Sequence, residues 1–428
     1  MSAPGLAAKS PTALLFVGVF CFVFADTLQQ TILPLSLAAA GASVTLIGIA
    51  IAVPQGIGFV TSLPAVAFGD RNGRRVVTVI GASIAATAML VLALTSSSSA
   101  FIWWMIPIIA FGLARLVVWI AVLATVSTTD NPFRMQGING ATQRGAAAVA
   151  AIVAGIIIAT EVWALGFVLV AAGLAAVVPV ALRALPRRPP WVDNTLPRPG
   201  RAYGVAIKLA TTRLTIVASA FVALCCLVVM MVGTSFFGLT LALALDPGEI
   251  AVTVVTLLLT RDLASIGFGL VFHRLILKVG LPGTVMCAAG CATVGLALLA
   301  FAGTSLVVLV LAAVLQGAAV AWCIGTTNIL AVGTGAESRS GAGLRIAASN
   351  IIPCVGALCL PVAFAATLQY GGPGALFAVA SAIALTLGAA AFLLSRVALR
   401  PVGGNEPDAL PSPSPSPRDT DIYQEDRT

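Results

Sequence analysis

Charged residues are scarce in this chain: 9% of its 428 residues are Asp, Glu, Lys or Arg, whereas a soluble domain has about 25%. Hydrophobic residues make up 59%, and the mean hydropathy is +1.07. Such a composition excludes a soluble protein and predicts an integral membrane protein. Aromatic residues are also few, at 7%, while glycine and alanine are abundant. This balance favours transmembrane helices packed through small residues over a β-barrel.

Histidine and lysine are rare too, and their rarity excludes several kinds of active site. The one histidine is His273, whereas a zinc hydrolase needs several His or acidic ligands and a serine hydrolase needs a base beside its serine. None of Lys9, Lys208 and Lys278 follows a glycine, as the phosphate-binding loop of an ATP-driven pump requires. The sequence therefore indicates neither an enzyme nor an ATP-driven pump, and it predicts no cofactor.

The eight cysteines all lie within apolar runs. This placement predicts small buried side chains rather than disulfides. Cys287 and Cys291 are one helical turn apart, but His273 belongs to a different loop, and structural zinc needs four ligands. We therefore expect no metal site.

Long apolar runs dominate what the sequence does contain. A helix needs about 20 apolar residues to cross about 30 Å of hydrocarbon. The segments that meet this requirement are 12–37, 44–68, 76–97, 101–127, 137–160, 162–184, 213–244, 249–276, 282–302, 305–331, 344–369 and 372–398. We expect an all-α integral membrane fold with twelve transmembrane helices.

Basic residues are distributed unevenly between the two sides of this predicted bundle. The turn after the second span holds Arg71, Arg74 and Arg75, and the positive-inside tendency places it in the cytoplasm. Counting crossings then assigns Arg134 and Arg144 to cytoplasmic loops or helix ends. Both termini are predicted to be cytoplasmic, in a multi-pass protein of the cell membrane. Because the net charge of +8 lies in these loops and termini, we expect no nucleic-acid partner.

A proline-rich stretch divides the spans into two groups of six, because prolines exclude a continuous helix there. The predicted units are a cytoplasmic N-terminus (1–11), a six-helix half (12–184), a cytoplasmic linker (185–212), a second six-helix half (213–398) and a disordered cytoplasmic tail (399–428) rich in Pro and Ser. An internal repeat supports the division, since Leu33–Gly41 resembles Phe237–Leu245 at the corresponding place in the second half.

The basic turn carries a recognisable motif. The run Asp70-Arg71-Asn72-Gly73-Arg74-Arg75 resembles the loop G-x-x-x-D-R-x-G-R-R of major facilitator superfamily transporters, although Val66 stands at the leading glycine. The second half carries a degenerate copy, with Gly269, His273 in place of the Asp, and Arg274. The resemblance extends over residues 12–398. It implies two parallel six-helix halves around a central cavity, with these motif residues acting in gating.

Four charged residues fall near the middle of predicted spans: Asp26, Arg115, Arg261 and Asp262. Each costs about 2.5 to 3.5 kcal/mol at a helix centre. They should therefore face the protein interior and pair with one another or with water in a cavity. Arg261 and Asp262 are neighbours, about 100° apart on a helix, so we expect both to need partners on other helices.

Asp26 and Arg115 are the best candidates for proton coupling, because desolvation and a nearby arginine shift a carboxylate's proton affinity in opposite directions. The resemblance supports this role, since the drug/proton antiporters of the superfamily use an acid in the first span. Arg115 matches the arginine of their fourth-span motif R-x-x-Q-G, but Val118 and Trp119 stand at the Gln and Gly positions. A static ion pair that fixes helix packing is the alternative. Arg261 and Asp262 are candidates for a coupling site or a structural pair.

Polar and aromatic side chains within apolar spans are candidates to line a substrate path. They are Gln29, Gln30, Gln55, Trp119, Thr234, Gln316, Trp322, Asn328 and Asn350. Buried amides also hold helices together by hydrogen bonds worth about 0.6 kcal/mol on average, so each has a structural alternative.

Together these features predict a proton-coupled secondary active transporter that exports small lipophilic compounds and works as a monomer in the lipid bilayer. The antiporters carry a Gly-Pro motif in the fifth span, whereas no proline lies between Gly145 and Gly155 here. The sequence therefore indicates transport more strongly than it indicates export. A proton symporter that imports a small metabolite is one alternative. A sensor or scaffold of the same fold that transports nothing is another.

Overall fold

The computed structural model describes residues 11–96, 101–127, 132–185, 199–243, 245–301, 305–332 and 342–399. The predictions for the N-terminal segment and for the C-terminal tail lie outside these residues, apart from Pro11 and Leu399 at their edges. The described part is helical, and none of it forms a strand.

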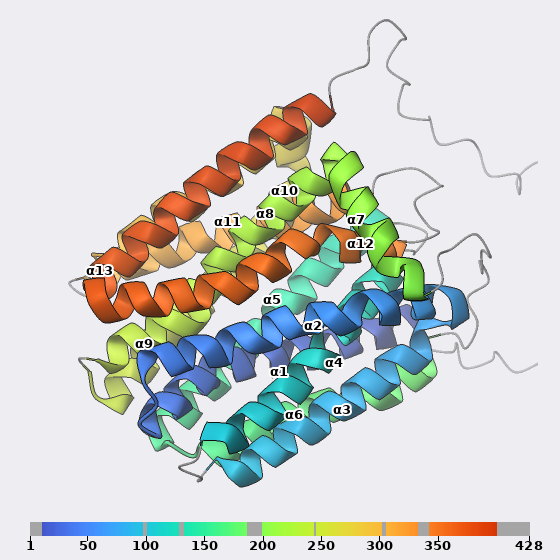
Figure 1. Ribbon diagram of the computed structural model, residues 1–428. Helices are drawn as coiled ribbons and strands as arrows, with labels where there is room; N and C mark the ends of the chain where they lie inside the picture. The colour runs from blue at the N-terminus through green and yellow to red at the C-terminus, as the bar shows by residue number, and fades with distance from the viewer. Residues whose placement is uncertain are drawn as a thin grey trace, which may run out of the picture.

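The first half of the chain forms six long helices that pack side by side (Figure 1). They are α1 (Pro11–Ala39), α2 (Val44–Asn72), α3 (Arg74–Thr95), α4 (Phe101–Ser127), α5 (Pro132–Thr160) and α6 (Trp163–Ala184). Their bounds agree with the predicted spans, except that α5 begins five residues earlier.

The second half contains helices that are interrupted or unusually long. They are α8 (Leu214–Met231), the π-helical turn η2 (Val232–Phe236), α9 (Phe237–Ala242), α10 (Pro247–Leu299), α11 (Leu306–Val332), α12 (Ala342–Ser349) and α13 (Ile351–Ala398). A π-helical turn loosens the regular hydrogen-bond ladder and often marks a functional place.

Helices α10 and α13 each contain two membrane spans. Their 53 and 48 residues exceed one bilayer crossing. The backbone leaves the helix at Gly280 (φ 73°) and Gly372 (φ 75°), a left-handed conformation that glycine adopts without strain. Figure 1 shows α13 folded back on itself as a hairpin. Ten stretches of the described chain are long and apolar enough to cross a membrane; with two spans in each of these helices, the described residues form the twelve-span all-α membrane fold.

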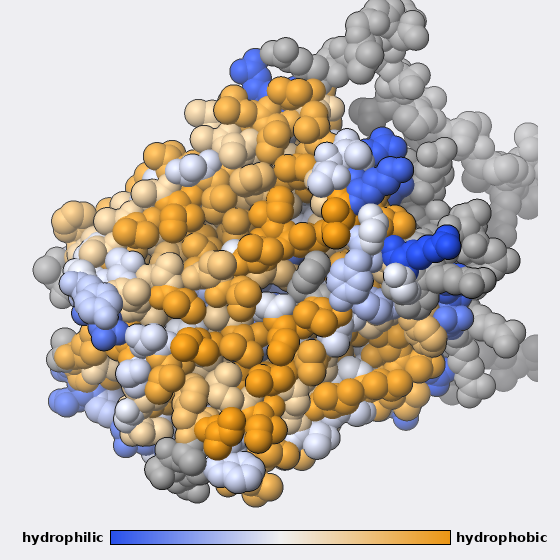
Figure 2. Space-filling view, in the orientation of Figure 1, coloured by the Kyte–Doolittle hydropathy of each residue, from blue (hydrophilic) through white to orange (hydrophobic). Residues whose placement is uncertain are grey.

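The exterior of the bundle is apolar along the helices. Large side chains such as Leu94, Leu270 and Val307 are more than two-thirds exposed, and orange apolar surface extends over most of the face in Figure 2. Hydrophilic residues collect near α7 and α12, at the end of the bundle that carries the Gly73 turn, which we call the basic end. A soluble protein rarely exposes so much contiguous apolar surface, so this surface fits a lipid environment.

The linker contains a helix that its prolines did not predict. Its five prolines all precede residue 200, and after the short turn η1 (Pro199–Arg201) the chain forms α7 (Ala202–Thr212). Ala202 and Ala206 are fully buried in an apolar cluster contributed by α2, α4 and α12. The Tyr203 hydroxyl donates to the Val60 carbonyl, and burial raises the pKa of this phenol, which keeps its proton in place. Helix α7 therefore fastens the linker across both halves at the basic end.

Small residues set the separation between α2 and α4. A Cβ atom on Gly112 would lie 2.4 Å from Pro54 Cα and 2.7 Å from Pro54 O, which are backbone atoms that cannot rotate away. We expect Gly112→Ala to destabilise the protein by about 1 to 3 kcal/mol through overpacking, seen as a lower Tm of the purified protein. Gly290→Ala is the matched control, because a Cβ there meets nothing within 4 Å. Equal Tm values for the two variants would show that α2 and α4 separate freely.

Candidate functional site

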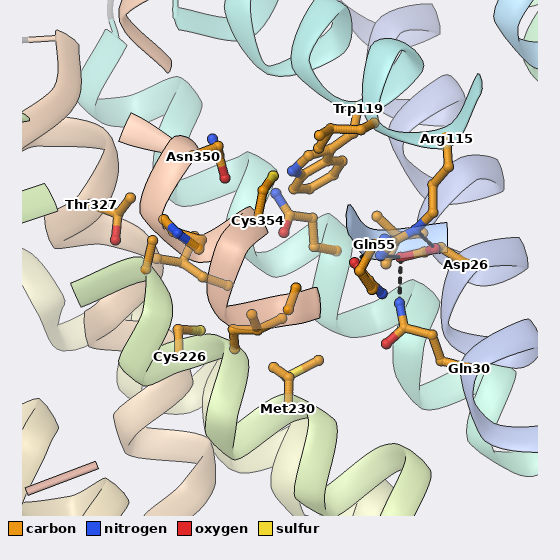
Figure 3. A pocket seen from close by; sticks show the side chains of 18 of the residues that line it. Asp26, Gln30, Gln55, Arg115, Trp119, Cys226, Met230, Thr327, Asn350 and Cys354 are labelled. Carbon is orange, nitrogen blue, oxygen red and sulfur yellow. Dashed lines mark hydrogen bonds and ion pairs between the residues drawn. The ribbon is translucent and has the colours of Figure 1, made fainter. Parts of the chain in front are cut away.

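A cavity of about 240 Å³ lies between the two halves. Helices α1, α2, α4 and α5 of the first half line it, together with α8, η2, α11, α12 and α13 of the second. Predicted substrate-path residues that line it are Gln30, Gln55, Trp119, Thr234, Asn328 and Asn350. Figure 3 shows the side chains converging on this space from both halves.

Asp26 on α1 and Arg115 on α4 form an ion pair on the cavity wall (Figure 3). Arg115 Nη2 donates to Asp26 Oδ2 at 2.8 Å, and Arg115 Nε donates to Asp26 Oδ1. The same carboxylate accepts from Gln30 Nε2 at 2.8 Å, and Arg115 Nη1 donates to Gln55 Oε1 at 2.5 Å. These four side chains tie α1, α2 and α4 together around one bidentate, charge-assisted contact.

This network is only partly closed to water. The side chains of Asp26 and Arg115 each keep 16% of their surface exposed, and both line the cavity.

A second charged cluster contains Arg261 and Asp262. Arg261 and Asp262 contact each other, at 3.2 Å for both Nε to Oδ1 and Nη2 to Oδ2. The two were predicted to need partners on other helices, and the long arginine side chain also reaches round the helix to the adjacent carboxylate. Arg261 Nη1 also lies 3.4 Å from Thr234 Oγ1, and both charged side chains are fully buried.

Arg144 is the third member of this cluster, and its assignment to a cytoplasmic helix end was wrong. Its Nη1 lies 3.3 Å from Asp262 Oδ1 and 3.5 Å from Met230 Sδ. Arg144 is buried and contacts Asp262, so its side chain lies inside the bundle and not at its end. The partner that Asp262 needed on another helix is therefore Arg144, and Arg144 also lines the cavity.

Three predicted substrate-path residues do not line this cavity: Gln29, Gln316 and Trp322. Gln29 is buried within the bundle. Gln316 Nε2 donates to Gly295 O at 3.4 Å. This amide therefore holds α11 to α10 by a hydrogen bond, which is the structural role that the sequence analysis gave as the alternative to a place on the substrate path. Trp322 packs edge-on against Phe268, with ring centroids 5.4 Å apart.

The cavity also contains polar and sulfur-bearing residues that sequence reasoning missed. They include Thr27, Gln143, Cys226, Met230, Thr327, Ser349 and Cys354. Gln143 could have been found by the same criterion that selected Gln30, namely an amide inside an apolar span. The Thr, Cys and Met residues carry no signal of this kind, since such residues are as common on lipid-facing surfaces and in packed cores.

The motif at the basic end forms a closed turn. Arg74 donates to Asp70 Oδ1 from Nε at 3.0 Å and from Nη2 at 2.8 Å. The turn needs Gly73, whose φ of 106° disfavours other residues. Arg71 lies in the last turn of α2, and Arg75 in the first turn of α3.

The degenerate copy in the second half behaves differently. Gly269, His273 and Arg274 lie inside α10, which continues to Gly280 before the chain turns. His273 and Arg274 are exposed, and the structure gives them no ion pair among the described residues. With His273 in place of the acid, this copy lacks a carboxylate that could accept from an arginine.

The cysteines are free, and the prediction that all of them are buried was wrong, because two are exposed and three are half-buried. Cys287 and Cys359 are exposed on the outer faces of α10 and α13, whereas Cys225, Cys323 and Cys354 are buried. A lipid-facing thiol and a core thiol have the same apolar sequence neighbours, so composition did not separate them. Within the described ranges, no group of three His, Cys, Asp or Glu residues could hold a metal ion.

Comparison with known proteins agrees with this architecture. The family model described as Major Facilitator Superfamily matches residues 15–260. No curated protein sequence matches the chain significantly. The human organic anion transporter MFSD10 (TETRAN) is similar in structure, with a TM-score of 0.64, 16% identity, and coverage of 89% of this chain and 98% of that one.

Two further solved structures share the fold. The nucleoside transporter NupG has a TM-score of 0.67 and 14% identity, and the match covers 90% of this chain and 100% of that one. A POT family transporter in complex with a thioalcohol-conjugated peptide has a TM-score of 0.68 and 14% identity, with 91% and 96% covered. At these identities the likeness establishes the fold.

Proposed function

This chain belongs to the Major Facilitator Superfamily and is a membrane transporter of that type, and from this premise we propose that it couples export of small lipophilic compounds to proton entry. The observation that carries the proposal is the Asp26–Arg115 pair on the wall of a cavity between the two halves. A carboxylate in the middle of a membrane-spanning helix costs several kcal/mol unless a cation or water compensates its charge. Charged groups that are costly in this way are found mainly at functional sites.

The proposed cycle alternates access to the cavity from the two sides of the membrane. Protonation of Asp26 from the outer side releases Arg115, and substrate binding from the cytoplasmic side restores the pair and expels the proton. Asp26 and Arg115 come from α1 and α4, so a change in their contact alters how these helices pack against the second half. Export, rather than import, rests on the resemblance of these two residues to the drug/proton antiporters.

Lipophilic cargo fits the apolar share of the cavity lining. Leu116 and Trp119 from the first half and Leu227, Met230 and Ile324 from the second contribute apolar surface. A few amides then fix orientation, as in ligand sites generally. The basic end faces the cytoplasm in this proposal, with both termini on that side of the cell membrane, because basic residues collect there. The transporter acts as a monomer.

A proton symporter that imports a small metabolite is the second candidate. The observation that favours it is the set of amides on the cavity wall, Gln30, Gln55, Asn328 and Asn350, which suit a polar substrate. The same Asp26–Arg115 chemistry serves either direction. Flux measurements separate the two candidates.

The test uses purified protein in two steps. A thermal-shift screen of drugs and metabolites across pH identifies ligands, because a compound that binds the folded state raises its apparent stability. Flux of each ligand into proteoliposomes is then measured under an imposed pH gradient. Antiport accumulates substrate in the acidic compartment and symport in the alkaline one, whatever the orientation of the protein. Protein-free liposomes control for passive trapping of weak bases, and absence of protein-dependent flux for every ligand would refute transport.

Arg115 provides a graded test of the ion pair. Arg115→Ala removes both charge and hydrogen bonds, whereas Arg115→Lys keeps the charge but loses the bidentate geometry. We expect the alanine variant to lose at least about tenfold in proton-driven flux, corresponding to about 1.4 kcal/mol, and the lysine variant to retain a measurable part. The readout is initial flux per folded protein in proteoliposomes. Equal activity of both variants would remove Arg115 from the mechanism.

A further inference from the structure

The buried charges around Asp262 do not balance. Both Asp262 oxygens accept from Arg261 at 3.2 Å, and Arg144 reaches Oδ1 at 3.3 Å, so two guanidinium groups share one carboxylate. Arg261 and Asp262 are fully buried, and Arg144 is 6% exposed. The other acid at mid-depth in the described helices is Asp26, which is already paired with Arg115. One positive charge is therefore left over inside the bundle, and Arg144 carries it.

Two hydrogen-bond donors beside this charge also lack acceptors. Within the described residues, Arg144 Nε and Gln143 Nε2 are buried atoms without a hydrogen-bond partner. Gln143 is 1% exposed, and both residues line the cavity. An unsatisfied buried donor costs about 1 to 3 kcal/mol, more when the group is charged. A ligand that supplies both an acceptor and a negative charge would remove both penalties at once.

From this geometry we propose that the cavity binds a small organic anion, with its carboxylate held by Arg144 and Gln143. A guanidinium matches the two oxygens of a carboxylate, and the adjacent amide adds a neutral donor. Leu227, Met230 and Ile324 line the same cavity and provide apolar contact for the rest of the molecule. A volume of about 240 Å³ is below the usual range for drug-sized ligands, so the ligand is small.

The inference rests on the proposed transport function and deepens it by naming the substrate class. Asp26 on α1 handles the proton, and Arg144 on α5 holds the substrate, in one cavity shared by both. A cationic substrate is disfavoured, because it would add to the surplus positive charge in a low-dielectric site.

Ligand protection of Cys226 tests the inference without a pH gradient. Cys226 lines the cavity, while Cys287 and Cys359 are exposed outside it and serve as internal controls. Purified protein is alkylated with N-ethylmaleimide, and each cysteine peptide is quantified by mass spectrometry. The probes are benzoate and 2-naphthoate, each compared with its uncharged primary amide. We expect the acids at millimolar concentration to slow alkylation of Cys226, the amides to have no effect, and the control cysteines to react equally in all samples.

Variants then assign the effect to Arg144. Arg144→Gln should raise the acid concentration needed for protection by at least about tenfold, and Arg144→Lys should retain part of the protection. Lys208→Gln, an exposed cation on α7 outside the cavity, is the matched control and should behave as wild type. Gln143→Leu is a second variant that keeps all charges and should weaken protection by the acids.

Three results would overturn the proposal: protection by the amides equal to that by the acids, protection by neither acid, or unchanged protection in Arg144→Gln. Because the assay needs no proton gradient, a failure here is distinct from a failure of proton coupling. A transporter with proton-driven flux and no acid binding would keep the proposed function and lose the substrate class.

Discussion

Replacing Asp26 with Asn should abolish proton-driven flux in proteoliposomes while ligand binding persists. Asparagine is nearly the same size, and its oxygen can still accept from Arg115, so the helices remain packed. The amide carries no titratable proton, and the link between protonation and the position of Arg115 is lost. We expect at least about a hundredfold reduction in gradient-driven flux, about 2.8 kcal/mol in transition free energy, measured as initial rates normalised to folded protein.

Two comparisons make the Asp26 result specific. Exchange of labelled for unlabelled substrate without a gradient should continue in Asp26→Asn, because exchange requires movement of the loaded carrier but no net proton transfer. Asp246→Asn applies the same chemical change at the N-terminus of α10, outside the cavity, and should leave flux unchanged. If Asp26→Asn retains wild-type proton-driven flux, Asp26 is a structural partner of Arg115 and the proton is carried elsewhere.

Replacing Asp262 with Asn should destabilise the protein more than the overpacking variant Gly112→Ala does. The variant leaves Arg144 and Arg261 buried without an anion, and breaking a buried pair in this way costs about 3 to 5 kcal/mol. We expect a much lower Tm in detergent and a lower yield of folded protein. Size-exclusion profiles and thermal unfolding of the purified variant measure the effect.

The other members of the cluster provide the controls for Asp262. Arg144→Gln removes the surplus charge and leaves the Arg261–Asp262 contacts in place, so its Tm should stay close to that of wild type. The double variant Asp262→Asn/Arg261→Gln should regain part of the lost stability, because it removes one stranded charge, and the double-mutant cycle gives the coupling energy. A wild-type Tm for Asp262→Asn alone would contradict the assignment of this carboxylate as the shared counter-ion.

The charged residues illustrate what sequence reasoning can reach. The sequence identified four of them, Asp26, Arg115, Arg261 and Asp262, because each interrupts an apolar run. A charged side chain in hydrocarbon costs free energy whichever way its helix is rotated. Arg144 escaped because its neighbours Asn139, Gln143 and Thr142 made the region resemble a helix end. Its contact with Asp262 depends on how α5 is rotated against α10, which the sequence does not give.

The cavity lining was harder to predict than the charges. Met230 lines the cavity, whereas Met286 is 61% exposed on the outer surface, and Cys226 and Cys287 differ in the same way. In each pair the flanking residues are apolar on all sides. In a soluble protein the polar face of a helix is exposed to water, so the opposite, apolar face is known to point inward. A membrane helix is apolar on the side that faces lipid and on the side that faces its neighbours, so this criterion does not separate the two.

The sequence by itself determined the number of spans and the family motif around Asp70. These properties follow from local composition, since each long apolar run crosses the bilayer and charged side chains are more stable in the water on either side of it. Only the tertiary structure decided that α7 fastens the linker at the basic end, that Arg144 shares Asp262 with Arg261, and that Gln143 rather than Gln316 faces the cavity. Those contacts depend on the rotation and depth of each helix against its neighbours, which one-dimensional apolar runs do not encode.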